Sequence, residues 1–245
     1  MDQGIKAIWY DLPEEGRDQY FEWLHGTCLP EILRLPGILW AAHYRITGGG
    51  GEMDKICRVL ARADVGKIGT GTQFLLLIGA GSPHVFFKPT HKEISLPSDP
   101  AAQEMTARRI GTRTAVFVEE ARINGPEYDR IVPSGTPGPA IQMGSFRVRS
   151  VEEEFDLAAW YAQYRLPAMA RMAGCIQTRK LLSVAGWAKH SVLYEFISLE
   201  ARHENFQKHE SRALDEKNWS NRILKYTIHA PGSPSVGTRI WPEES

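Results

Sequence analysis

The feature that most constrains this chain is an internal repeat. When the sequence is shifted by 137 positions, the stretch 23–37 aligns with the stretch 160–174 without gaps. The identical pairs are Trp23 and Trp160, Leu29 and Leu166, Pro30 and Pro167, Arg34 and Arg171, and Gly37 and Gly174. Because the patterns on both sides of the stretch also agree, the repeat predicts two structural units of the same kind in one chain.

The first half shows a pattern of four strands and two helices. Short apolar runs predict strands over 5–11, 38–46, 73–80 and 112–123. Apolar residues at helical spacing predict a helix over 18–35. Asp99 followed by Pro100 is typical of a helix start, which predicts a second helix over 100–110. The long stretch 47–72 is expected to form a lid or crossing loop, with a short helix over 53–62.

The second half repeats this order. Strands are predicted over 142–149, 175–183, 191–199 and 223–230, and helices over 151–172, 201–211 and 215–221. The stretch between the halves contains four prolines and three glycines, a composition that is typical of a linker. We therefore expect a first ferredoxin-like repeat over 1–123, a linker over 124–140 and a second repeat over 141–245, each in the order βαββαβ.

The expected fold class is α+β. In a ferredoxin-like unit two helices cover one face of the sheet and leave the other face bare, so two units can bury both bare faces against each other. The segment 74–78, Phe-Leu-Leu-Leu-Ile, is apolar at every position, as a sheet covered on both faces requires. We predict that the antiparallel sheets of the two repeats pack into one intrachain α/β barrel.

Charge and cysteine spacing exclude several classes of partner. Lys and Arg number 29 and Asp and Glu number 29, which argues against binding to a nucleic-acid backbone or to an anionic membrane. The longest apolar run is broken by Gly79, Gly81 and Pro83 and is too short to span a bilayer. The three cysteines form no zinc-binding pair, and no signal peptide is visible. We expect a cytoplasmic protein with a small-molecule ligand, without metal, and with homo-oligomerisation left open.

Two short motifs follow Trp23 in the repeat, Leu29-Pro30 and then Leu35-Pro36-Gly37 at the start of a strand. This pattern resembles the EthD-like branch of the dimeric α/β-barrel superfamily, in which a Trp and a His precede Leu-Pro. The resemblance implies paired ferredoxin-like units with a ligand cavity between sheet and helices. Members of the superfamily include cofactor-free monooxygenases, lactone isomerases, polyketide cyclases and haem-using enzymes. The histidine of the pattern is replaced by Cys28 in the first copy and by Arg165 in the second, so its acid–base role does not carry over to either residue.

His25 is the candidate catalytic residue. It lies three residues before Cys28 and therefore on the same helix face. A histidine with an ordinary pKa can act as a general base near neutral pH, whereas a histidine on the flank of a helix often binds only a carbonyl group. Cys28 is a candidate substrate-binding residue, and inert packing on the apolar face is the alternative.

Aromatic residues in the first two predicted strands supply the other candidate substrate-binding residues. Tyr10, Trp40 and Tyr44 are expected to share one sheet face and to form a wall for a planar or apolar ligand. Core packing is the alternative for all three. His43 and Arg45 have the opposite parity to Trp40, which predicts that they face the interface between the halves or solvent.

The second half offers a separate group of polar candidates. Arg147, Gln177 and Arg179 have matching parity on two predicted strands, and Tyr194 on the next strand joins them. Arginine can bind a carboxylate in a bidentate manner, so the group could hold an anionic ligand. An ion-pair network across the barrel interface is the alternative.

A helical histidine beside a possible aromatic wall, taken with what the resemblance implies, predicts a small-molecule enzyme, namely a cofactor-independent isomerase, cyclase or monooxygenase that acts on an aromatic or lactone-like compound. The alternative is a non-catalytic protein that binds a small ligand or haem, which the missing histidine favours. No cofactor is favoured from the residues, although the resemblance allows haem.

Overall fold

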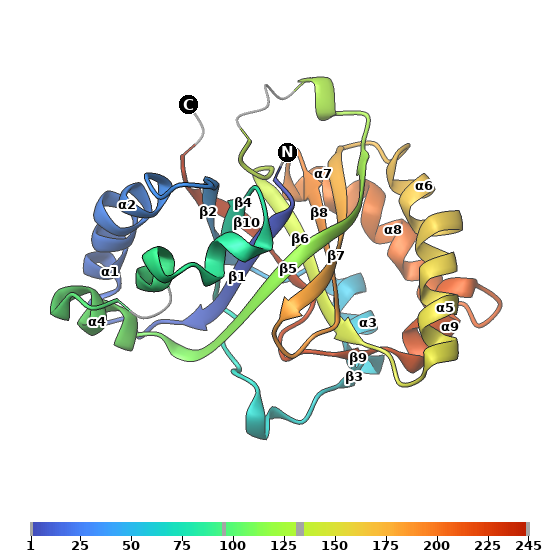
Figure 1. The fold of residues 1–245 in the computed structure, drawn as a ribbon. Helices are drawn as coiled ribbons and strands as arrows, with labels where there is room; N and C mark the ends of the chain where they lie inside the picture. Colours follow the sequence, from blue (N-terminus) through green and yellow to red (C-terminus); the bar gives the residue numbers. More distant parts are fainter. Residues whose placement is uncertain (1, 95–96, 131–134, 244–245) are drawn as a thin grey trace.

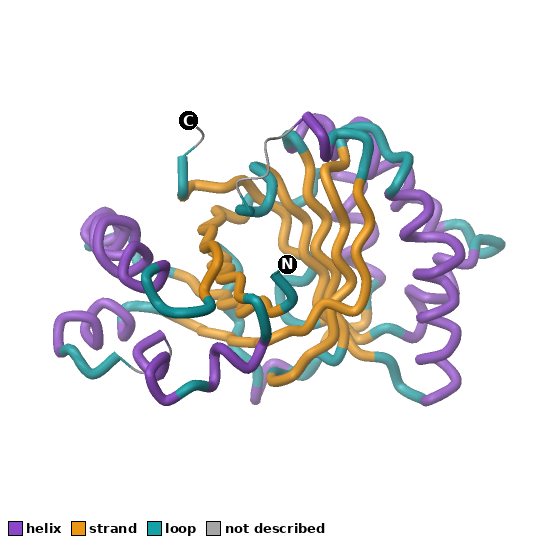
Figure 2. Tube along the Cα trace, turned by 45° about the horizontal axis from the view of Figure 1, so that its top comes forward, coloured by secondary structure: helices purple, strands orange, loops and turns teal. Residues whose placement is uncertain are grey.

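Eight strands close into a barrel (Figure 2). The computed structural model describes residues 2–94, 97–130 and 135–243. Around the ring the strands follow the order β10-β2-β4-β1-β5-β7-β8-β6, and a β10–β6 pairing closes it. Each of these neighbours is antiparallel. The strands are β1 (Gly4–Asp11), β2 (Ile38–Ile46), β4 (Phe74–Ala80), β5 (Ile110–Asn124), β6 (Ala140–Arg147), β7 (Cys175–Ala185), β8 (His190–Phe196) and β10 (Ser235–Trp241).

The helices cover the barrel on two opposite sides (Figure 1). In the first half, a continuous helical segment made of α1 (Arg17–Trp23), the π-helix η1 (Leu24–Cys28) and α2 (Leu29–Leu33) follows β1, and α4 (Pro100–Ala107) follows β4. In the second half, the segment after β6 consists of α5 (Val151–Trp160), the π-helix η6 (Tyr161–Arg165) and α6 (Leu166–Met169). The segment after β8 consists of α7 (Leu199–Ala201), the π-helix η7 (Arg202–Phe206), α8 (Gln207–Glu210), the 3₁₀ turn η8 (Ser211–Leu214) and α9 (Trp219–Tyr226).

The strand order confirms the predicted fold class. The first half has the spatial order β5-β1-β4-β2 and the second half β10-β6-β8-β7, which is the same arrangement of fourth, first, third and second strand. Two ferredoxin-like repeats therefore share one barrel. The division into 1–123, 124–140 and 141–245 stays a prediction, since the sheet runs continuously through both halves.

The two π-helices η1 and η6 occupy equivalent places in the repeat. Each spans five residues and ends directly before a Leu-Pro pair, and Leu29 donates its backbone N–H to the carbonyl of Leu24, five residues earlier. A proline has no N–H to donate and its ring crowds the preceding turn, so a wider turn before Pro30 and Pro167 relieves that crowding. Cys28 and Arg165 directly precede the two Leu-Pro pairs. Each therefore occupies the same position, the last residue of a π-helix.

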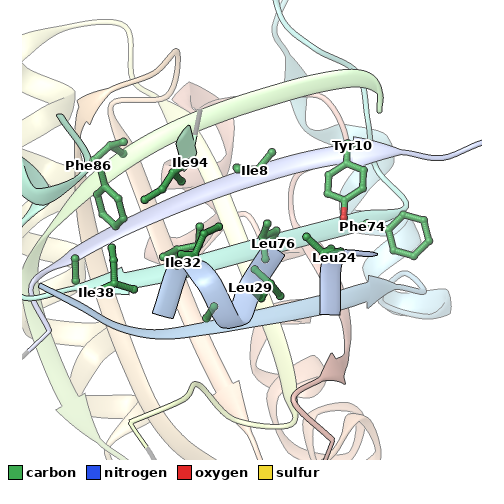
Figure 3. Packing of buried hydrophobic residues seen from close by; sticks show 14 of the residues in the cluster. Ile8, Tyr10, Leu24, Leu29, Ile32, Ile38, Phe74, Leu76, Phe86 and Ile94 are labelled. Atoms are coloured by element: carbon green, nitrogen blue, oxygen red, sulfur yellow. The ribbon is translucent and has the colours of Figure 1, made fainter. Parts of the chain in front are cut away.

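Alternating side chains of the strands build separate cores. The barrel interior contains large residues from both halves, including Trp9, Trp40, Tyr44, Phe117 and Leu181. The helix-facing side of the first sheet forms a second core, in which Leu24, Leu29 and Ile32 pack onto side chains of β1 and β4 (Figure 3). A third core lies under the helices of the second half.

The connection between β2 and β4 crosses to the second half. It contains α3 (Gly51–Val59), the two-residue strand β3 (Ala61–Arg62) and the turn η2 (Val65–Lys67). β3 pairs in parallel with β9 (Ile228–His229) beyond α9, and Leu224 of α9 packs on the apolar side of α3. Other short 3₁₀ turns are η3 (Pro83–Phe87), η4 (Pro89–Ile94) and η5 (Tyr128–Arg130).

The strand predicted over 223–230 is confirmed only at β9, and it is not the fourth strand of the repeat. Helix α9 extends to Tyr226, and Asn218 caps it by accepting a hydrogen bond from the Ser220 N–H. The fourth strand of the second repeat is instead β10, which pairs with both β2 and β6 and closes the barrel. No helix among the described residues is long and apolar enough to cross a membrane.

Candidate functional site

A chain of hydrogen bonds links three side chains on the helix-facing side of the first sheet. The Tyr10 hydroxyl on β1 lies 2.8 Å from Nε2 of His43 on β2. Nδ1 of His43 lies 2.8 Å from Nε2 of His25, which projects from the π-helix η1. His43 is fully buried and uses both ring nitrogens, so it joins the buried tyrosine to the partly buried His25.

Burial keeps this chain uncharged. It lowers the pKa of His25 to about 4 and holds the pKa of His43 well below its usual range. Burial also raises the pKa of Tyr10 well above its usual range. At neutral pH the arrangement therefore fits a neutral chain in which Tyr10 donates to His43 and His43 donates to His25.

Aromatic rings hold His25 in place. Its imidazole stacks on Phe21, with ring centres 5.5 Å apart, and on Trp241 of β10, with centres 6.0 Å apart. A strand of the second half therefore contributes to the environment of a first-half histidine.

At the other end, an arginine lies beside the chain. The rings of Tyr10 and of Tyr20 in α1 contact each other edge to face with centres 5.8 Å apart, and Arg109 donates its Nε–H to the Tyr20 hydroxyl oxygen at 2.7 Å. The Arg109 guanidinium lies 4.9 Å from the centre of the Tyr10 ring. A permanent positive charge therefore lies beside two buried phenol groups.

Arg109 also faces a cavity of about 400 Å³ between the first sheet and its helices. This volume is within the range of about 300–1,000 Å³ that is typical of small-molecule pockets. The lining is mainly apolar, with Ile8, Leu76 and Ile78 from the strands and Trp23 and Ile32 from the helices. Cys28 lines it as well, and burial raises the pKa of this thiol to about 11, so it is protonated and a poor nucleophile.

The predicted aromatic wall is not formed. Trp40 and Tyr44 point into the barrel interior, whereas Tyr10 lies on the helix-facing side. Trp40 donates its indole N–H to Asp2 at 2.7 Å, and Tyr44 donates its hydroxyl to the Gly138 carbonyl at 2.9 Å. Alternation determines which residues of one strand share a face. It does not determine which face of the neighbouring strand lies on the same side of the sheet, and this is why the prediction failed.

His43 is the residue that the sequence prediction misplaced. His43 lies on the opposite face of β2 from Trp40, as predicted. That face is covered by the helices and is not the interface between the halves. The available signal was the helical segment after β1, because a buried polar group on a covered sheet face needs a partner and His25 lies on that segment.

The polar candidates of the second half lie in three different places. Arg179 is buried and pairs with Asp2 and Glu119, each at 2.7 Å, and Gln177 donates to Glu195 at 3.1 Å. Arg147 is exposed and covers the Trp187 ring. Tyr194 lies on the helix-facing side and lines a second cavity. The structure therefore does not bring Arg147, Gln177, Arg179 and Tyr194 into one site.

The second cavity, of about 100 Å³, corresponds in position to the first. Trp160 and Arg165 line it, and these residues align in the repeat with Trp23 and Cys28 of the first cavity. The two helix-facing cavities therefore lie at equivalent positions of the two repeats. They differ in volume and in the residue before Leu-Pro, which is Cys28 in the first and Arg165 in the second.

Neither cavity fits haem, which needs an axial His, Cys, Met or Tyr ligand. In the first, the donor among the described lining residues is the protonated Cys28. In the second, His229 contacts Thr227 at 3.2 Å and Ser233 at 3.5 Å; Met53, Tyr161 and Tyr194 also line it, but a cavity of about 100 Å³ is too small to hold a haem. No group of three or more His, Cys, Asp or Glu residues that could hold a metal ion occurs in the described part of the chain.

No protein-family model and no curated protein sequence matches the chain. Solved structures match along its whole length. A candidate monooxygenase from Lactobacillus acidophilus is 10% identical, with a TM-score of 0.52 over 98% of this chain and 94% of that chain. The chain has the dimeric α/β-barrel fold.

Other structures with this fold carry different names. An anthrone oxidase-like protein is 11% identical, with a TM-score of 0.57 over 97% of this chain and 90% of that chain. A chlorite dismutase from Candidatus Nitrospira defluvii is 12% identical, with a TM-score of 0.51 over 97% and 91% of the two chains. At these identities the likeness concerns the fold alone, and the EthD-like branch stays a prediction.

Proposed function

We propose that the chain is a small-molecule enzyme of the dimeric α/β-barrel type that removes a proton from an aromatic or lactone-like compound. The observation that carries this proposal is the hydrogen-bonded chain of Tyr10, His43 and His25, which lies beside Arg109 at the first-half cavity. An apolar cavity, the positive charge of Arg109 and a hydrogen-bonded route for a proton therefore lie on the helix-facing side of the first sheet.

The substrate is a compound with a C–H that is acidified by a carbonyl group, either adjacent to it or conjugated with it through a ring. Its ring occupies the apolar cavity, and its oxygen lies against Arg109, which stabilises the enolate that forms. Tyr10 is buried under the Arg109 guanidinium and does not line the cavity, so the proposed reaction requires the substrate to reach past Arg109 to Tyr10. The proton then passes to the Tyr10 oxygen while Tyr10 gives its own proton to Nε2 of His43. His43 then gives its Nδ1 proton to Nε2 of His25, and His25 releases a proton to solvent.

This proton removal is the step that isomerase, cyclase and cofactor-independent monooxygenase reactions share. Reprotonation at another carbon gives an isomer, attack on a second carbonyl group gives a ring, and reaction of the enolate with dioxygen as co-reactant gives an oxygenated product. An anthrone, a tricyclic ketone whose acidic C–H lies across the central ring from the carbonyl and is conjugated with it, belongs to this substrate class, and a protein of the same fold is described as anthrone oxidase-like.

The proposal is tested by incubating the purified protein with anthrones, other aromatic ketones and unsaturated lactones and following turnover by mass spectrometry. We expect turnover of at least one compound, and a fall of about 10²-fold or more in His25→Ala. Unchanged turnover in His25→Ala would show that His25 has no part in the reaction. Binding without turnover would favour the non-catalytic alternative, and a haem absorbance band in the purified protein would favour haem binding.

A further inference from the structure

The second-half cavity contains a buried arginine whose donors are not all used. The Arg165 side chain is 9% exposed and donates from Nη2 to Oε1 of Glu210 at 3.2 Å. Its Nε and Nη1 atoms are buried and have no hydrogen-bond partner. Buried donors of this kind are normally satisfied, and leaving them unpaired is unfavourable, especially in a charged group.

Aromatic rings fix the guanidinium in this position. It lies 4.8 Å from the centre of the Trp160 ring, 5.2 Å from that of Phe206 and 5.5 Å from that of Tyr194. Arg165 is placed by the π-helix η6 directly before a Leu-Pro pair. The unpaired donors therefore belong to an ordered side chain at the wall of a cavity.

The charges around the cavity favour an anion. The Glu210 carboxylate accepts from Arg165 and, at 3.0 Å, from the Gln142 amide. Oε1 of Gln142 in turn accepts from Arg202 at 2.9 Å. Two buried arginines thus flank one carboxylate, which leaves one positive charge in excess. Burial lowers the pKa of His229, at the cavity, to about 3, so that histidine adds no charge.

The size and lining of the cavity limit the ligand further. Its volume of about 100 Å³ is smaller than the cavity of about 150 Å³ that accepts benzene in a well-studied case. Apart from the polar groups near Arg165, the lining is mostly apolar and includes Val192, Ile223 and Met53. We propose that this cavity binds a short-chain monocarboxylate, with the carboxylate on Arg165 and the alkyl chain among the apolar residues.

Helix α3 covers this site. Met53, Ile56 and Leu60 line the cavity, although they come from the β2–β4 connection of the first half. The chain reaches α3 through Gly48–Gly51, and the Gly49 carbonyl accepts from Arg202 at 3.2 Å. Movement of α3 on this glycine-rich segment gives the ligand a way in.

The proposal is tested by isothermal titration calorimetry and thermal unfolding with sodium propionate at constant ionic strength. Sodium chloride and the uncharged propionamide serve as comparison ligands. We expect propionate to bind one per chain and to raise Tm, and neither comparison ligand to do so. Hydrogen exchange should show slower exchange of the α3 amides with propionate. Equal effects of propionate, propionamide and chloride would overturn the proposal.

Two variants locate the site. In Gly144→Val the new side chain points toward Val192, at an ordinary contact distance of 3.4 Å for its Cβ, and fills the cavity while Arg165 is kept. In Arg165→Met the charge is lost. We expect each to weaken propionate binding by about tenfold or more. Arg147→Gln, an exposed arginine of the same half, is the matched control and should bind like the wild type.

If Arg165→Met does not fold, Gly144→Val decides the question. Binding that persists in Gly144→Val, or a liganded crystal structure with only water beside Arg165, would refute the site. Because Arg165 and Gly144 line this cavity and not the first-half cavity, failure of this proposal leaves the proposed enzyme activity of the first-half cavity untouched.

Discussion

Removing a single hydroxyl from the buried chain should measurably destabilise the protein. Tyr10 is fully buried, and its hydroxyl bonds His43 at 2.8 Å. In Tyr10→Phe the ring and its packing are kept, but Nε2 of the fully buried His43 loses its partner. Leaving such a group unpaired costs about 1–3 kcal/mol, so we expect the free energy of unfolding to fall by that amount.

The assay is urea unfolding followed by tryptophan fluorescence. With an m-value of about 3 kcal/mol per molar urea, the expected loss lowers the midpoint by about 0.3–1 M. Tyr128→Phe, which removes a hydroxyl from a half-buried tyrosine in the connection between β5 and β6, is the matched control and should change stability by less than about 0.5 kcal/mol. If Tyr10→Phe unfolds at the same urea concentration as the wild type, the hydrogen-bonded chain does not exist as described.

Three further predictions follow from the same structure. Burial lowers the pKa values of His25 to about 4 and of His229 to about 3, so between pH 6.5 and about 4 the unfolded chain binds protons that the folded chain does not. Unfolding midpoints should therefore fall as the pH drops through this window, and a flat profile would contradict the assignment. Arg179→Met removes one of the two arginine partners of Asp2 and Glu119, which both keep Arg122 at 2.7 Å, and should cost about 1–3 kcal/mol in urea unfolding; a loss well below about 1 kcal/mol would show that Arg179 adds little to the network. Gly79→Ala places a Cβ 2.0 Å from the Trp40 ring and should lower Tm clearly, whereas an unchanged Tm would mean that the ring can move aside.

The fold was largely predictable from local pattern. The run 38–46 begins after Gly37 and is mostly apolar and aromatic, and the structure gives β2 the same bounds. The repeat of Leu-Pro and Gly at a distance of 137 residues located the equivalent helices and strands of both halves. The strand predicted over 223–230 is present only as Ile228–His229, because the apolar residues of 223–226 suit either a strand or a buried helix face, and the cap at Asn218 and tertiary packing select the helix there.

The candidate site was predictable only in part. His25 and Cys28 were correctly placed on one helical segment, because that relation depends on local spacing alone. The contact of His25 with His43 depends on the relative phase of β1 and β2, and a β-bulge between Ile38 and Trp40 changes which face each residue occupies. No pattern within a single strand contains that information.

Proton exchange on a bound substrate tests the proposed function most directly. An anthrone-type ketone is incubated with the protein in D₂O without oxygen, and replacement of its acidic C–H by C–D is followed by NMR. We predict that the wild-type protein accelerates this exchange and that Tyr10→Phe and His25→Ala reduce the acceleration about 10²-fold or more, with Tyr128→Phe unchanged. Exchange that is no faster with the protein than without it, or equally fast in all variants, would contradict the account.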